Sequence, residues 1–185
     1  FGGKMKYAPI KDGRFDLPAI ADLVDARTRI VFLCNPNNPT GTAFSRDDLT
    51  AFMKRCPPDV LVVLDEAYYE YVDWDEFPDS VKMLKDHPNI MILRTFSKIY
   101  GLAGLRVGYG IAREEVIRDV SKTKTPFNVN LPAQEAALAA LGDDEFVERS
   151  VAVNAEGKNY LYREFERLGL KYHPTEANFI CVHVG

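Results

Sequence analysis

The chain has 185 residues, of which 46% are hydrophobic and 27% are charged. This composition is typical of a globular domain with one sizeable core, and it argues against a disordered chain. A net charge of −4 gives no reason to expect a nucleic-acid partner or a membrane surface, and no apolar run is long enough to cross a bilayer.

Short apolar runs rich in β-branched residues alternate with amphipathic stretches along the chain. This alternation predicts an α/β fold, with a mostly parallel sheet and helices on both faces. The strands after the first are almost continuously apolar, as expected where both faces of a sheet are covered. The predicted strands are 4–10, 29–35, 60–65, 90–95 and 106–111.

The amphipathic stretches predict helices. Segment 16–25 begins with an acidic cap and an early proline, and segment 45–55 has Ser45 and Asp48 at the spacing of a capping-box variant. The predicted helices are 16–25, 45–55, 78–86, 113–122, 131–141 and 143–168, the last either continuous or broken at Gly157.

The pattern changes near residue 143, where a long helix precedes two short strands, 171–173 and 178–184. We therefore expect residues 1–142 to belong to a large domain. Residues 143–185 would form a linking helix and the truncated start of a smaller α+β domain. The chain begins with FGG and stops at Gly185 inside a predicted strand, so we expect a fragment of a larger protein.

The three cysteines, Cys34, Cys56 and Cys181, are odd in number and far apart in the sequence. They have no metal-ligand spacing and suggest no disulfide framework, which favours a reducing, cytoplasmic setting.

Polar segments follow several of the predicted strands, where open α/β sheets bind their ligands. The first, NPNNPTG at 35–41, is either a simple turn or a stiff loop that fixes an asparagine amide. The second, VVLDEAYY at 62–69, ends an apolar strand with two acids, which is also typical of the metal-binding strand of an ATPase. That reading needs a phosphate-binding loop, and the chain contains none.

The third segment, TFSKIYGLAGLRVGY at 95–109, places hydroxyls, a lysine and an arginine around glycines. Lone lysines are usually solvated surface charges, but this combination would suit an anion such as phosphate. A fourth segment, PFNVNLPAQ at 126–134, by itself indicates only a loop leading into a helix.

Together, and in this order, the four segments resemble the fold-type I aminotransferases that use pyridoxal 5′-phosphate (PLP), and most closely the histidinol-phosphate aminotransferases. The run 95–109 is the most specific motif, and NNPTG at 37–41 is the next. The resemblance covers essentially the whole chain, which corresponds to the middle of the family's length.

The resemblance implies a role for each matching residue. Lys98 matches the lysine that forms the Schiff base with PLP and then moves a proton for the reaction. Asp65 matches the carboxylate that pairs with the pyridine nitrogen. Asn38 and Tyr68 match the pair that hydrogen-bonds the ring oxygen O3′.

The resemblance also implies a phosphate site and partners. Thr95, Ser97 and Arg106 match the cup that holds the cofactor phosphate. The implied reaction is amino transfer between histidinol phosphate and 2-oxoglutarate in histidine biosynthesis, so the partners are a small amino donor and a 2-oxo acid. A homodimer is expected for the full-length protein.

Parts of the family's site have no match in this chain. The aromatic residue that stacks on the ring, the turn that completes the phosphate cup and a tyrosine lent by the partner subunit would lie before residue 1. The arginine that binds the substrate carboxylate would lie after residue 185. We therefore expect an incomplete site, inactive by itself.

Three alternatives share these residues. Another PLP enzyme, such as an aromatic aminotransferase or a threonine-phosphate decarboxylase, would differ in how it holds the substrate. A PLP-binding regulatory domain would have a DNA-binding segment ahead of this part. An inert fragment would fold without binding the cofactor.

Overall fold

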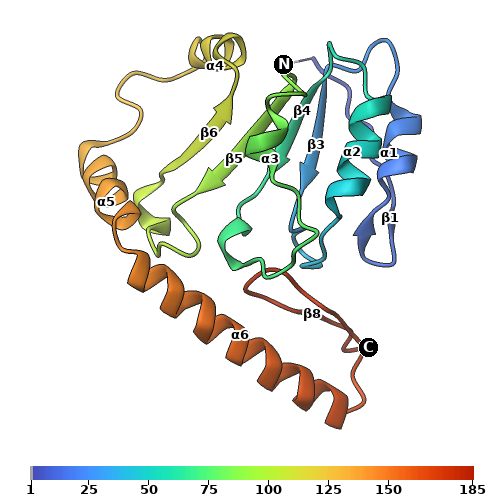
Figure 1. The fold of residues 1–185 in the computed structure, drawn as a ribbon, viewed down its shortest axis with the longest axis vertical. Coiled ribbons are helices and arrows are strands. Elements are labelled where there is room, and N and C mark those ends of the chain that lie inside the picture. The colour runs from blue at the N-terminus through green and yellow to red at the C-terminus, as the bar shows by residue number, and fades with distance from the viewer. Residues whose placement is uncertain (1) are drawn as a thin grey trace.

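The computed structural model describes residues 2–185, and its centre is a four-stranded sheet (Figure 1). The strands lie in the order β3 (Ile30–Cys34), β4 (Leu61–Asp65), β5 (Ile90–Thr95) and β6 (Gly108–Ala112). The first three run parallel, and β6 pairs antiparallel with β5. The predicted α/β fold with a mostly parallel sheet is confirmed.

Two helices cover one face of this sheet. Helix α1 (Leu17–Leu23) begins after Asp16, whose side chain accepts a hydrogen bond from the Ala19 backbone N–H. Helix α2 (Arg46–Arg55) begins after Ser45 and has the predicted capping box. Their apolar side chains form the main core with alternate residues of β3, β4 and β5. This core includes Leu17, Ile20, Val31, Leu33, Leu49, Phe52, Met53, Val62, Leu64, Ile90 and Ile92.

The opposite face of the sheet is covered less evenly. Val63 and Met91 are buried there, whereas Ile30 and Phe32 on β3 are 49% and 67% exposed. Successive side chains of a strand point to opposite faces. In β3, Val31 and Leu33 are therefore buried on the helix-covered face while Ile30 and Phe32 are exposed on the other. Within residues 2–185, the expected cover of both faces is therefore met at β4 and not at β3.

The remaining helices follow the predicted positions, and the predicted bounds of 131–141 are confirmed. They are α3 (Ser80–Met83), α4 (Glu114–Ser121), α5 (Leu131–Leu141) and α6 (Asp144–Arg167), with short 3₁₀ turns η1 (Tyr69–Tyr71) and η2 (Ala103–Leu105). Helix α3 is a single turn, shorter than predicted, and α6 is continuous through Gly157. No helix among residues 2–185 combines the length and apolar character that a membrane span requires.

The C-terminal elements lie beyond the carboxyl ends of the parallel strands. Helix α6 runs below that edge of the sheet, with the small antiparallel pair β7 (Tyr172–His173) and β8 (Cys181–Val182) beside it (Figure 1). A second apolar cluster joins these elements to the sheet edge. Its buried members are Tyr68, Tyr71, Ile99 and Ala177, and Val147, Val151 and Phe179 pack against them. The predicted domain division after residue 142 stays a prediction.

The first predicted strand, 4–10, is wrong except at its last residue. Residues 2–9 form no strand, and β1 (Ile10–Lys11) pairs instead with β2 (Arg14–Phe15) in a hairpin. The two residues of its turn, Asp12 and Gly13, have φ values of 50° and 76°. Asp-Gly favours this turn because both positions need positive φ. The local turn signal therefore outweighs the extended pattern before it.

The position of Arg106 also differs from the prediction that it begins a strand. It ends η2 in the left-handed conformation, with φ 57°, and β6 starts two residues later at Gly108. The chain must reverse here because β6 returns antiparallel to β5.

Candidate active site

The carboxyl ends of β3, β4 and β5 bring the sequence-predicted residues to one edge of the sheet. Cys34 pairs with Asp65 in register, and Asp65 pairs with Leu93, so β3 and β4 end level and β5 extends two residues further. Asp65 is the last residue of β4 and Thr95 the last of β5. Ligands of open α/β sheets bind beyond these strand ends.

The loop that follows β3 is held by its own hydrogen bonds. The Asn35 side chain accepts from the Phe44 N–H at 2.9 Å, and Asn37 Nδ2 donates to Thr40 Oγ1 at 2.8 Å. Gly41 takes φ 73°, and a Cβ there would overlap Thr175, so only glycine fits. The loop is therefore stiff, as its sequence predicts.

This stiff loop presents Asn38 to Tyr68. Asn38 Nδ2 donates a hydrogen bond to Tyr68 Oη at 3.0 Å, across 30 residues of sequence. The Tyr68 ring is 4% exposed and packs edge-on against Phe179, with 5.1 Å between ring centroids. Burial of the ring fixes the direction of the hydroxyl, so the two residues form one rigid polar unit.

Lys98 lies above this unit. Its Nζ is 5.2 Å from the centroid of the Tyr68 ring, and the residue is exposed. Phe96 and Ile99, on either side, are buried and anchor the segment. Within residues 2–185 Lys98 Nζ forms no hydrogen bond or salt bridge, so the amine is available to a ligand.

Asp65 is half-buried at the end of β4, on the same edge of the sheet. Its Oδ1 accepts a hydrogen bond from the Ala67 N–H at 3.2 Å, and no bond to its second oxygen occurs within residues 2–185. Burial raises the pKa of the Cys34 thiol on the neighbouring strand, and the negative charge of Asp65 raises it further. The free carboxylate oxygen can accept a hydrogen bond from a protonated ring nitrogen of a ligand.

The residues predicted to bind phosphate are brought together only in part. Thr95 Oγ1 accepts from the Ser97 N–H at 3.0 Å, so these two hydroxyls share one turn. Arg106 is exposed, and its Nη1 donates to the Ala103 carbonyl at 2.7 Å. It lies two residues before Gly108, which pairs with Thr95, but it makes no hydrogen bond with Thr95 or Ser97 within the described residues.

An ion pair that the sequence analysis missed lies behind these residues. Arg94 Nε and Nη2 both donate to Glu66 Oε2, at 3.0 and 2.9 Å. The sequence suggests Glu66 only as a metal ligand, whereas in the structure its carboxylate pairs with Arg94. The available signal was an arginine next to the end of an otherwise apolar strand.

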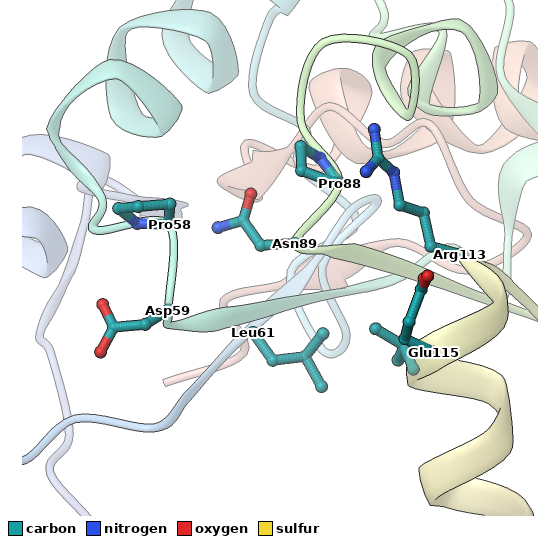
Figure 2. Close-up of a pocket in the computed structure, with 8 residues that line it drawn as sticks. Pro58, Asp59, Leu61, Pro88, Asn89, Arg113 and Glu115 are labelled. Carbon is teal, nitrogen blue, oxygen red and sulfur yellow. The ribbon is translucent and has the colours of Figure 1, made fainter.

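Two hollows of the surface have linings that do not include Lys98. One, of about 280 Å³, sits at the amino ends of β4 and β5, and Figure 2 shows the side chains that line it, among them Asp59, Leu61, Asn89, Arg113 and Glu115. The other, of about 390 Å³, lies between η1 and α6, and its lining includes Tyr71 and Arg149. Within residues 2–185 no group of three or more His, Cys, Asp or Glu side chains could hold a metal ion.

Comparisons with known proteins agree with this arrangement. The family model described as aminotransferase class I and II matches residues 2–185. The histidinol-phosphate aminotransferase of Moorella thermoacetica is 56% identical over 99% of this chain and 48% of its own length. That of a Geobacillus species is 50% identical over all of this chain and 50% of its own length.

A solved structure gives the same result. The crystal structure of histidinol-phosphate aminotransferase from Sinorhizobium meliloti in complex with pyridoxal-5′-phosphate superposes with a TM-score of 0.91. It is 34% identical, and the match covers all of this chain and 50% of that one. The chain thus spans about half the length of the curated relatives it matches.

Proposed function

We propose, since this chain belongs to the aminotransferase class I and II family, that it supplies the cofactor-binding part of a PLP-dependent aminotransferase. The observation that carries the proposal is the unengaged amine of Lys98 above Tyr68, whose hydroxyl is held by Asn38. A lysine amine, a fixed phenol and a nearby carboxylate are the groups that a pyridoxal ring requires.

The donor set of this edge fits PLP. The hydroxyls of Thr95 and Ser97 and the guanidinium of Arg106 are phosphate ligands by chemistry. The free oxygen of Asp65 suits a protonated pyridine nitrogen, and the Asn38–Tyr68 pair suits an oxygen on the ring. Lys98 Nζ would hold the aldehyde carbon.

When bound, PLP supplies an aldehyde that captures amines and a ring that accepts electrons from the substrate α-carbon. Asp65 keeps the proton on the ring nitrogen, because its charge favours the protonated form. Tyr68 and Asn38 orient the ring oxygen. As a free amine, Lys98 Nζ would act as the base that takes a proton from the substrate α-carbon and as the acid that gives it back.

The proposed reaction is amino transfer between histidinol phosphate and 2-oxoglutarate, in histidine biosynthesis. The support is the name shared by relatives that are 50 and 56% identical to this chain. The proposal includes a homodimer and a cytoplasmic location. The proposed cytoplasmic location agrees with the three cysteines, which are free of disulfides.

The substrate is tested by offering histidinol phosphate, phenylalanine and threonine phosphate separately to the complete enzyme with PLP and 2-oxoglutarate. We expect glutamate to form fastest with histidinol phosphate, and Lys98→Ala to abolish its formation. Lys122→Ala, at an exposed lysine of the same chain, serves as the control and should leave the rate unchanged.

A preference for phenylalanine, or release of carbon dioxide from threonine phosphate, would contradict histidinol phosphate as the substrate. Either result would leave PLP as the proposed cofactor. No glutamate with any donor, together with no PLP-dependent absorbance, would overturn the proposed function.

A further inference from the structure

The pair formed by Glu66 and Arg94 is withdrawn from solvent. Their side chains are 2% and 13% exposed, whereas both partners of every other ion pair in residues 2–185 are at least a third exposed. Taking two charges out of water is costly, and well-packed apolar residues often replace such a pair without loss of stability. Stability alone is therefore a weak reason for this pair.

Arg94 has a third contact, with the ring of Tyr69. The guanidinium carbon lies 3.5 Å from the ring centroid, while Nε and Nη2 both bond one oxygen of Glu66. A planar guanidinium can stack and donate at once, which a lysine ammonium cannot do. Arg94 thus holds Glu66, the residue that follows β4, and Tyr69, the first residue of η1.

Each member of this trio adjoins, in sequence, a residue of the candidate site. Glu66 follows Asp65, Tyr69 follows Tyr68, and Arg94 precedes Thr95. The Glu66 N–H also bonds the Leu93 carbonyl at 2.9 Å, which continues the register of β4 with β5.

The ion pair and the site residues Asp65 and Thr95 lie on opposite faces of the sheet edge. Successive side chains of a strand alternate, so Glu66 and Arg94 share the face of Val62, Leu64 and Ile92. Asp65 and Thr95 therefore share the other face. Movement of the pair would shift both strand ends without any contact between the pair and the cofactor.

Burial of Glu66 disfavours the ionised form of its carboxyl. Burial raises the pKa of this carboxyl, and the nearby Ser80 hydroxyl and Arg94 oppose the rise. The buried Ser80 Oγ has no hydrogen-bond partner within the described residues. Among residues 2–185, Arg94 is the cation that pairs with Glu66.

We propose that Glu66, Arg94 and Tyr69 form a positioning clamp that sets the spacing of Asp65, Thr95 and Tyr68 around PLP. The three are positioning residues, because they act through their sequence neighbours. This inference rests on the proposed function and extends it to residues that do not touch the cofactor.

The test measures PLP affinity by absorbance titration of the complete apoenzyme, with four variants. Arg94→Met and Tyr69→Leu each remove one contact of the clamp, and Glu66→Gln removes one charge. We expect each to weaken PLP binding by about tenfold or more, as the loss of supporting groups does at comparable sites. Arg94→Lys should recover part of the loss, since it keeps the charge and lacks the planar fork.

Two controls separate positioning from general stability. The double variant Glu66→Leu with Arg94→Met leaves no unpaired charge, so it should recover the melting temperature of the apoenzyme but not the PLP affinity. It should also shift the pH midpoint of the bound cofactor's visible absorbance. Disruption of the exposed pair by Asp119→Asn with Lys122→Met should change neither quantity.

Wild-type PLP affinity in Arg94→Met and Glu66→Gln would overturn the clamp, as would full recovery of affinity in the double variant. If the unaltered enzyme binds no PLP, the proposed function fails first and the clamp fails with it.

Discussion

At the scale of single residues, Tyr68 has both a packing role and a hydrogen-bonding role. Its ring belongs to the cluster that joins the sheet edge to α6, and its hydroxyl accepts the Asn38 hydrogen bond. The same residue therefore packs the C-terminal elements and orients a polar group of the candidate site. A change that removes only the hydroxyl separates these two roles.

Tyr68→Phe keeps the ring and leaves Asn38 Nδ2 without this acceptor. One hydrogen bond contributes about 0.5–1.5 kcal/mol, so we expect PLP affinity to fall by up to about tenfold with a small change in melting temperature. Absorbance titration of the complete apoenzyme measures the affinity. Tyr160→Phe, at an exposed tyrosine, should bind PLP as the wild type does.

A large fall in melting temperature with unchanged PLP affinity would contradict this account. It would mean that the Tyr68 hydroxyl stabilises the fold and plays no part in holding the cofactor.

Asp25 links the N-terminal segment to the end of α1. Its carboxylate accepts from Lys6 Nζ at 2.9 Å and from the Arg27 N–H at 2.9 Å, and these bonds hold its pKa well below the ordinary 3.8. A depressed pKa stabilises the folded state above the unfolded pKa, and this stabilisation is lost as the pH falls toward the folded pKa.

Asp25→Asn should therefore lower the melting temperature at neutral pH and narrow its difference from the wild type as the pH falls below about 4. Thermal melts across that range measure the effect. Asp75→Asn, at a carboxylate without an ion pair in residues 2–185, is the control. A difference that stays constant with pH would contradict the assigned role of the Asp25 charge.

At the scale of elements, helix α2 shows how closely a local signal can fix a boundary. Ser45 accepts from the Asp48 N–H, and Asp48 accepts in return from the Ser45 N–H. Both contacts involve residues three apart, so the sequence contains all the information they need.

Ser45→Ala should lower the free energy of unfolding by about 1 kcal/mol, because it leaves an N-terminal N–H of α2 without its acceptor. Urea denaturation of the complete apoenzyme measures this value. Thr50→Ala, in the same helix, removes only a hydroxyl bonded to the Arg46 carbonyl and should be nearly neutral. Equal effects of the two variants would be inconsistent with the capping role.

Local signals account for most of the elements that the sequence predicts correctly. Apolar runs mark β3, β4 and β5, and side-chain caps mark the starts of α1 and α2. The error at 4–10 has the same origin, since an extended segment needs a partner strand and the sequence does not show whether one is present. The Asp12-Gly13 pair is a local hairpin signal that the predicted strand 4–10 does not take into account.

Contacts that depend on register were beyond the sequence analysis. The Glu66–Arg94 pair requires the observed register of β4 and β5, and no pattern in either strand fixes that alignment. The resemblance implied that Asn38 and Tyr68 share one ring oxygen as ligand, and the direct hydrogen bond between them was not predicted. Motifs thus identified the residues near the strand ends, and the fold was needed to show which of them touch.

At the scale of the whole molecule, two apolar clusters hold different elements in place. The main core holds α1 and α2 on the sheet, and the second cluster holds α6 and the C-terminal strands across the strand ends. Asp65 and Thr95 end two strands of the main core, and Tyr68 belongs to the second cluster. This arrangement gives Lys98 an open position above buried neighbours.

The attachment of PLP to Lys98 tests the account most directly. The complete enzyme is incubated with PLP, reduced with borohydride, digested and mapped by tandem mass spectrometry, with Lys98→Arg treated in parallel. We predict a reduced cofactor adduct on Lys98 and its loss in the variant. An adduct spread equally over exposed lysines such as Lys82, or one that persists in Lys98→Arg, would contradict the account.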